Sequence, residues 1–137
     1  MRERYWILDE NNDPVPVEDV VQWAEKFMSQ DRQVAKTQLQ GAAVSTVFLG
    51  LDLNPGDGPP WLYETLVFED ADADFEIASL GPWRASTKEQ ALEAHRNVVA
   101  AVEQELEDYH EHMRKARERS QNTQERGRIL KWRKKPK

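Results

Sequence analysis

The sequence lacks cysteine altogether and has no long apolar run. Without thiols the chain has no disulfide, no thiolate zinc site and no cysteine nucleophile, so its fold must rest on packing. A membrane-spanning helix needs roughly 20 apolar residues, and no stretch approaches that length. The N-terminal segment MRERYW also lacks the apolar core of a signal peptide. We therefore expect a cytoplasmic protein that makes no membrane contact.

Positive charge is scarce over most of the chain and concentrated at its end. Residues 1–110 hold 8 Lys and Arg against 22 Asp and Glu, whereas residues 111–137 hold 11 against 3. The formal net charge of −6 therefore combines an acidic body with a basic tail. An acidic body mainly favours solubility, while a basic tail is typical of contact with nucleic acid or an acidic partner.

Apolar periodicity and turn-forming clusters together predict an α+β fold with one core. We expect an antiparallel β-sheet of about four to five strands, a short helix at about residues 17–29 and a long C-terminal helix at about residues 87–119. Residues 1–119 form the predicted domain, and residues 120–137 form a basic tail that we expect to be disordered. The expected strands cover residues 4–8, 34–40, 43–52, 61–69 and, at an edge, 77–80.

The short helix is predicted from apolar residues spaced as one helical face. We expect this face to lie in the core. Trp23 falls outside the stripe, which predicts a half-buried position at its edge. The stripe consists of Val17, Val20, Val21, Ala24, Phe27 and Met28.

The two strongest strands, 43–52 and 61–69, flank a loop rich in Pro and Gly. If they pair as a hairpin, Val47 shares one face with Glu64, while Phe48 shares the other with Tyr63. Both faces are then largely apolar. A sheet of that kind must be covered twice, by the two helices or by another chain.

The long helix is predicted to begin at Ser86-Thr87-Lys88-Glu89, which matches a capping box. Its apolar residues then alternate at spacings of three and four, which is a heptad period. At about 1.5 Å per residue this helix is about 50 Å long, more than a domain of this size covers. We expect its second half to project or to pair with a partner, a second copy included. The predicted helix interface is Leu92, His95, Val99, Val102, Leu106, Tyr109 and Met113, with Ala116 continuing the stripe.

Two segments come near known ligand motifs and then depart from them. Residues 70–74 have the acid spacing with which a calcium loop begins, but Phe75 and Gly81 stand where such a loop needs Gly and Glu. The loop at 53–60 is rich in Gly but lacks the Gly-Lys-Ser/Thr ending of a phosphate loop. We therefore predict no metal and no cofactor.

The histidines do not form a catalytic or metal-binding set by their spacing. His110 and His112 are two residues apart, which points them in different directions on a helix. His95 lies on the apolar stripe, where a core or interface histidine with a hydrogen-bonded ring is expected. We predict that the protein is not an enzyme.

The base of the 53–60 loop holds the candidate recognition residues, since loops held by a rigid hairpin often serve binding. Glu64 falls on an apolar face, where a carboxylate needs a partner. We expect an ion pair with Arg84 or Arg96, and the alternative is that Glu64 lines a pocket. The predicted binding residues are Asp52, Asn54, Trp61, Tyr63, Glu64 and Arg84.

The basic tail offers a second candidate surface, for nucleic acid. A tryptophan among basic residues can stack on a base while its neighbours neutralise phosphate. The candidate residues are Arg128, Lys131, Trp132, Arg133, Lys134 and Lys135.

The central hairpin carries a recognisable pattern, VSTVFLGLD at residues 44–52 and PPWLYETLVF at residues 59–68. It resembles a family of small uncharacterised proteins encoded by bacteriophages and prophages. The resemblance covers roughly residues 1–100, and Trp61 and Tyr63 stand where Leu and Phe are frequent in the family. It implies action in the cytoplasm of a host cell and brings no established activity.

These observations predict a non-enzymatic protein that binds a host or phage protein, for instance as an antagonist of host defence. One alternative is an oligomeric protein that sequesters a small molecule or nucleotide. Another is a nucleic-acid-associated protein that uses its basic tail, or an acidic body that mimics DNA.

Overall fold

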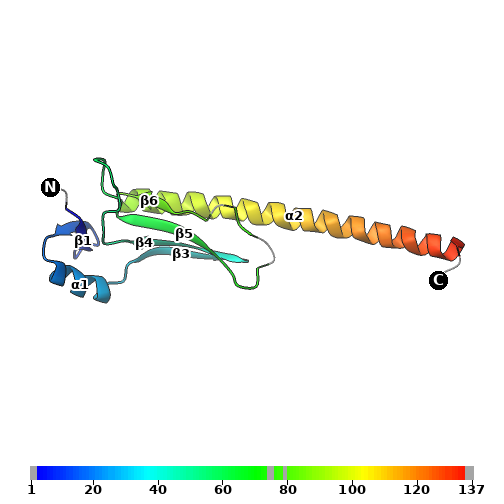
Figure 1. Ribbon diagram of the computed structural model, residues 1–137, viewed down its shortest axis with the longest axis horizontal. Helices are drawn as coiled ribbons and strands as arrows, with labels where there is room; N and C mark the ends of the chain where they lie inside the picture. The colour runs from blue at the N-terminus through cyan, green and yellow to red at the C-terminus, as the bar shows by residue number, and fades with distance from the viewer. Residues whose placement is uncertain (1–2, 74–75, 79, 135–137) are drawn as a thin grey trace. The chain divides into compact units, whose positions relative to one another are not determined.

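The computed structural model describes residues 3–73, 76–78 and 80–134, with side chains described as far as residue 123. The described chain has the predicted α+β architecture, with six strands in two antiparallel sheets, one short helix and one long C-terminal helix (Figure 1). It divides into two compact units, Met1–Val102 and Glu103–Lys137. The first unit holds both sheets and the core.

The smaller sheet is a ribbon of β1 (Tyr5–Leu8) and β2 (Pro14–Val17). The Asp9 carboxylate closes the turn between them by accepting two backbone N–H bonds, and Asn12 adopts a left-handed φ of 61°. We did not predict β2, because Pro14 was assigned to a cluster of turn-forming residues at 9–14 and Pro16 to the first turn of the helix. Pro14 and Pro16 are compatible with this strand because the outer edge of a two-stranded ribbon has no neighbouring strand. A backbone N–H that would bond to such a neighbour is therefore not needed there.

Helix α1 (Val20–Ser29) begins later than predicted, at an Asp19 cap. The Asp19 carboxylate accepts hydrogen bonds from the backbone N–H of Val21 at 2.9 Å and of Gln22 at 3.3 Å. Such a cap fixes the start of a short helix. Helix α1 lies against the β1–β2 ribbon.

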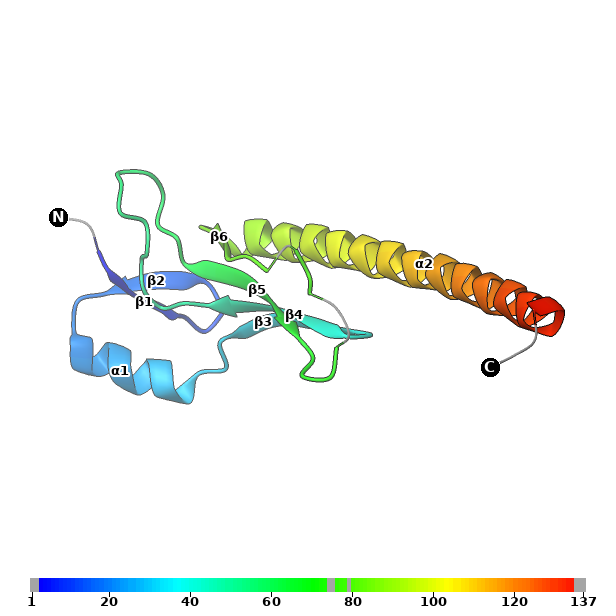
Figure 2. The same cartoon turned by 45° about the vertical axis from the view of Figure 1, so that its right-hand side comes forward.

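The larger sheet has the order β3-β4-β5-β6, antiparallel throughout (Figure 2). A two-residue turn with Gly41 at φ 99° joins β3 to β4. A bulge interrupts β3 between Gln33 and Ala35. The strands are β3 (Gln33–Leu39), β4 (Ala42–Phe48), β5 (Tyr63–Glu69) and β6 (Trp83–Ala85).

The edge strand next to β5 lies later in the sequence than predicted. The described residues of 77–80 form no strand, although the Leu80 carbonyl oxygen accepts a hydrogen bond from Val67 N at 3.0 Å. Strand β6 takes the edge instead, with Arg84 opposite Glu64. A three-residue strand gives too little periodicity to be found in a sequence.

The register of the central hairpin is the predicted one, with Phe48 opposite Tyr63 and Val47 opposite Glu64. One face of the sheet is buried along most of β4 and β5 and contributes to the core. Phe48 and Tyr63 pack there with ring centroids 5.5 Å apart. The buried residues of this covered face in β4 and β5 are Val44, Thr46, Phe48, Tyr63, Thr65 and Val67.

Helix α2 (Lys88–Lys134) covers this face with its first part. The capping side chain is that of Thr87, one residue after the predicted Ser86. Thr87 Oγ1 accepts from the Gln90 N–H, and the Gln90 side chain accepts from the Ser86 N–H, both at 3.1 Å. The predicted positions His95, Val102 and Leu106 are buried. Ala91 and Val98 are also buried, whereas the predicted Leu92 and Val99 are half-buried.

The same helix continues to Lys134, whereas we predicted an end near residue 119 and a disordered tail. Residues 111–134 are rich in Glu, Gln, Arg and Lys, which have high helix propensity. Ion pairs one turn apart, such as Arg114 with Glu118 at 2.9 Å, favour the helix further.

The opposite face of the four-stranded sheet is open. Its side chains are half-buried or exposed, and Phe68 is 55 % exposed. No element in the described part of the chain covers this face, because α1 packs on the β1–β2 ribbon instead. In β4 and β5 the open face consists of Ser45, Val47, Glu64, Leu66 and Phe68, and Ala43 lies at its margin.

Candidate functional site

Two of the predicted binding residues, Asp52 and Asn54, form hydrogen bonds within the loop at 53–60. The Asp52 carboxylate accepts hydrogen bonds from the N–H groups of Asn54 at 2.9 Å and Trp61 at 3.0 Å. The Asn54 side chain bonds the Pro59 carbonyl and the Gly56 N–H, both at 2.8 Å. These bonds hold the loop in one conformation, so Asp52 and Asn54 have a structural use here.

Glu64 and Arg84 form an ion pair across β5 and β6, with 3.2 Å between carboxylate and guanidinium. Of the two predicted partners of Glu64, the structure selects Arg84. The Arg84 guanidinium also lies 5.8 Å from the centre of the Trp61 ring. Glu64 and Arg84 belong to the open face.

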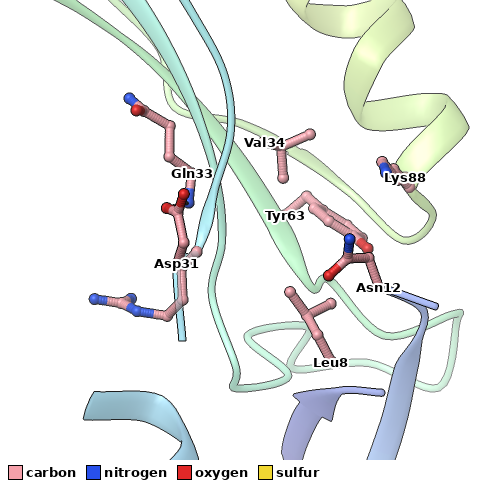
Figure 3. A pocket seen from close by; sticks show the side chains of 8 residues that line it. Leu8, Asn12, Asp31, Gln33, Val34, Tyr63 and Lys88 are labelled. Carbon is pink, nitrogen blue, oxygen red and sulfur yellow. Dashed lines mark hydrogen bonds between the residues drawn. The ribbon is translucent and has the colours of Figure 1, made fainter. Parts of the chain in front are cut away.

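Tyr63 is separated from that group, because neighbouring residues of a strand point to opposite faces. It lies on the covered face and is 1 % exposed. The structure therefore does not bring Tyr63 together with Glu64 and Arg84 on one face. Tyr63 instead borders a pocket shared with Asn12 and Lys88 (Figure 3), two residues that the sequence analysis did not single out.

His95 is the centre of a buried hydrogen-bonded chain between α2 and the sheet. Its two ring nitrogens lie 2.9 Å from Thr37 Oγ1 and 2.8 Å from Thr46 Oγ1. Thr46 Oγ1 is in turn 2.6 Å from Thr65 Oγ1. Burial lowers the pKa of His95, which favours the neutral ring. The predicted role as a core histidine with a hydrogen-bonded ring is confirmed, and both ring nitrogens are engaged.

Helix α1 turns a different face to the body than the sequence predicts. The indole N–H of Trp23 donates to the Gly50 carbonyl oxygen at 2.8 Å, and its ring centroid lies 5.1 Å from Tyr5 and 4.8 Å from Phe27. Gly50, at φ 74°, permits this approach, since a Cβ there would lie 3.1 Å from the Phe27 ring.

Part of the predicted core stripe is consequently exposed, although Val17 is buried in β2 and Phe27 is half-buried. Met28 is 86 % exposed, Val21 66 % and Val20 50 %. With half-buried Ala24, these residues fall within about 100° of the helix circumference, at 3.6 residues per turn. We call these four residues, Val20, Val21, Ala24 and Met28, the outer stripe.

The second unit is a helix with a charged surface. Arg114 lies 2.9 Å from Glu118, and Lys115 lies 3.5 Å from Glu111. The Tyr109 and His110 rings are 5.7 Å apart. Pairing of the predicted interface with a second copy stays a prediction.

The tail candidates Arg128, Lys131, Trp132, Arg133 and Lys134 lie on the described helix backbone, but their side chains lie outside the described part, as does all of Lys135. Nucleic-acid binding by the tail stays a prediction.

Among the residues that the structure describes, no cluster of three or more His, Asp or Glu side chains is placed to hold a metal ion. No helix there has both the length and the apolar character needed to cross a membrane.

Comparison with known proteins gives no family for this chain. No family model, no curated protein and no solved structure matches it. The surfaces and contacts described above are therefore the basis for proposing a function.

Proposed function

We propose that this protein is a non-enzymatic binding protein that acts by protein–protein association, with the outer stripe of α1 as its contact surface. The observation that carries the proposal is the exposure of Val21 and Met28, at 66 % and 86 %. Contiguous exposed apolar side chains are typical of protein interfaces. A helix that lays an apolar face into a groove is a common mode of recognition.

The way α1 is held supports this use. The Asp19 cap, the Trp23 bond to Gly50 and the Arg32 guanidinium 3.8 Å above the Phe27 ring all fix the inner side of the helix. A helix that is already ordered loses little conformational entropy on binding. The outer stripe is thus presented in a preorganised form.

The charge around the stripe indicates the chemistry of the partner. Glu18, Asp19 and Glu25 lie on or beside α1, and residues 1–110 are strongly acidic. A complementary surface has an apolar groove with a basic rim. The resemblance to phage proteins makes a bacterial host protein the expected owner of that surface, and antagonism of a host defence is one form that this binding takes.

A pull-down from bacterial host lysate with quantitative mass spectrometry tests the proposal. The test variant is V21Q/M28Q, which removes exposed apolar atoms, and the matched control is Q22A/K26A on the polar side of the same helix. We expect wild type and control to enrich the same protein and the test variant to lose at least tenfold of that enrichment. Equal enrichment by all three proteins, or none by wild type, contradicts the proposal.

Light scattering on the same proteins tests the case in which the partner is a second copy of this chain. In that case wild type and control form a dimer, and V21Q/M28Q is monomeric. Circular dichroism checks that each variant keeps its helix content, which is expected because the substituted side chains are exposed.

A further inference from the structure

The Tyr63 hydroxyl is buried and unpaired. Tyr63 is 1 % exposed, and its hydroxyl has no hydrogen-bond partner among the described residues. Buried polar atoms in folded proteins nearly always have a partner, since an unpaired hydroxyl forfeits its bonds to water. This hydroxyl therefore calls for a partner that is not a residue of the described chain.

Tyr63 lines a pocket of about 290 Å³ together with Asn12 and Lys88 (Figure 3). Separate segments supply its walls, namely the end of β1, the β1–β2 turn, the start of β3 and the first residue of α2. This volume is at the lower end of the range for ligand pockets, which suits a small molecule. The lining residues are Leu8, Asn12, Asp31, Arg32, Gln33, Val34, Tyr63 and Lys88.

Two further polar groups at the pocket are available for a ligand. No hydrogen bond or ion pair joins the Asn12 carboxamide or the Lys88 ammonium to another residue in the part of the chain that the structure describes. Arg32 differs, since its guanidinium lies over Phe27. Tyr63, Asn12 and Lys88 thus offer two neutral hydrogen-bonding groups and one positive charge.

The surrounding charges limit what the pocket accepts. Burial, and then the nearby Asp13 carboxylate, raise the pKa of Tyr63 to about 12, so its hydroxyl remains a proton donor at neutral pH. Lys88 attracts an anion, while Asp13 and Asp31 oppose a second negative charge. The apolar side chains of Leu8 and Val34 favour a ligand with a small apolar body.

We propose that this pocket binds a small monocarboxylate, whose carboxylate is held by the Tyr63 hydroxyl, the Lys88 ammonium and the Asn12 carboxamide. The apolar body of the ligand lies against Leu8 and Val34. This site shares no residue with the outer stripe of α1, so its test is independent of the proposed association.

A titration of the full-length protein followed by ¹⁵N–¹H NMR tests the site. The probe is isovalerate, with isovaleramide as the uncharged molecule of the same shape and inorganic phosphate as the more highly charged anion. We expect saturable shifts of the Asn12, Tyr63 and Lys88 amides, with a dissociation constant on the order of a millimolar for so small a ligand. Isovaleramide and phosphate bind at least tenfold more weakly. Equal binding of the amide, or no saturable shift with isovalerate, overturns the proposal.

The variant Y63F separates a ligand contact from a structural one. Loss of a hydrogen bond to a charged group weakens binding about tenfold to a hundredfold. The urea midpoint of the free protein should stay unchanged or rise, because an unpaired hydroxyl is removed from the interior. A lower midpoint with unchanged affinity overturns the proposal, since water or protein then satisfies the hydroxyl.

Charge is tested with K88Q, and K36Q on β3 is the matched control because Lys36 does not line the pocket. K88Q should bind isovalerate at least tenfold more weakly, while K36Q and the α1 variant V21Q/M28Q should bind as wild type does. Weakening of equal size in K88Q and K36Q indicates only a general effect of charge and overturns the assigned site.

Discussion

The two faces of the four-stranded sheet handle polar groups in different ways. On the covered face, Thr46, Thr65 and His95 bond to one another without net charge. On the open face, Glu64 and Arg84 form an ion pair and remain partly exposed, at 16 % and 34 % of their side chains. Desolvation explains the difference, because a buried charge is far more costly than a buried, hydrogen-bonded hydroxyl. Stability should therefore depend on the covered face, while the open face remains free to vary.

The largest contrast between the faces should come from two phenylalanines of the sheet. Phe48 is 1 % exposed and Phe68 is 55 % exposed. We expect F48A to lower the free energy of unfolding by about 3–5 kcal/mol, through lost burial and a cavity. The matched variant F68A should cost about 0.5 kcal/mol. Urea denaturation measures both, and similar losses would remove the distinction between the faces.

The next largest effect should follow from removing the imidazole of His95. H95A leaves the Thr37 and Thr46 hydroxyls without their partner and opens a cavity, so we expect a loss of about 2–4 kcal/mol. Exposed His110, changed to Ala, is the control and should cost less than about 0.5 kcal/mol. A loss as small as that of the control would mean that the hydrogen-bonded chain contributes little.

The same histidine gives a test in acid. Because burial lowers the pKa of His95 in the folded state, the unfolded state takes up its proton first as the pH falls below about 6.5. Wild type should lose stability in that range, and H95Q should lose less between pH 7 and pH 5. Urea midpoints at a series of pH values measure the difference. Parallel profiles would contradict a buried neutral ring.

A smaller effect is expected in alkali from Tyr63. Its folded-state pKa of about 12 exceeds the ordinary value of 10, so the unfolded state loses this proton first as the pH rises. Between pH 10 and pH 12, wild type should lose roughly 2 kcal/mol more than Y63F. Denaturation midpoints of both proteins across this range provide the measurement. An equal loss would place the hydroxyl in contact with solvent.

The smallest effect should come from the ion pair on the open face. E64Q keeps the shape of the side chain and removes its charge. We expect a loss of no more than about 1 kcal/mol, diminished further at high salt, because the pair is partly exposed. A loss of several kcal/mol in urea denaturation would show that the open face is covered in solution.

The strands of the central hairpin were predictable, because alternation within each strand determines which of its residues share a face. Which of the two faces lies in the core was not predictable, because both are largely apolar. The start of α2 was predictable to within one residue, since Ser86, Thr87, Glu89 and Gln90 all suit a cap.

The orientation of α1 was not predictable in the same way. Its apolar arc includes Trp23 and Phe27 on one side and Val21 and Met28 on the other, and either half could have faced the core. The choice depends on Gly50, which lies at the end of another strand and leaves room for the indole. Periodicity within a helix carries no information about such a distant contact.

The Tyr63 pocket could not be predicted from the sequence for a related reason. Asn12, Val34, Tyr63 and Lys88 are far apart in the sequence and meet only in the folded chain. The one local signal was the turn-forming cluster at residues 9–14, where Asn tolerates a left-handed φ. That signal predicts a turn and not a ligand.

Strand β3 has a consequence for how copies of this protein behave at high concentration. It is an edge strand of seven residues, and a free edge can template the addition of strands from other molecules. The bulge between Gln33 and Ala35 interrupts its hydrogen-bonding register, and Lys36 adds a charge that repels an identical neighbour. The chain thus limits its own fibril-like stacking at this edge.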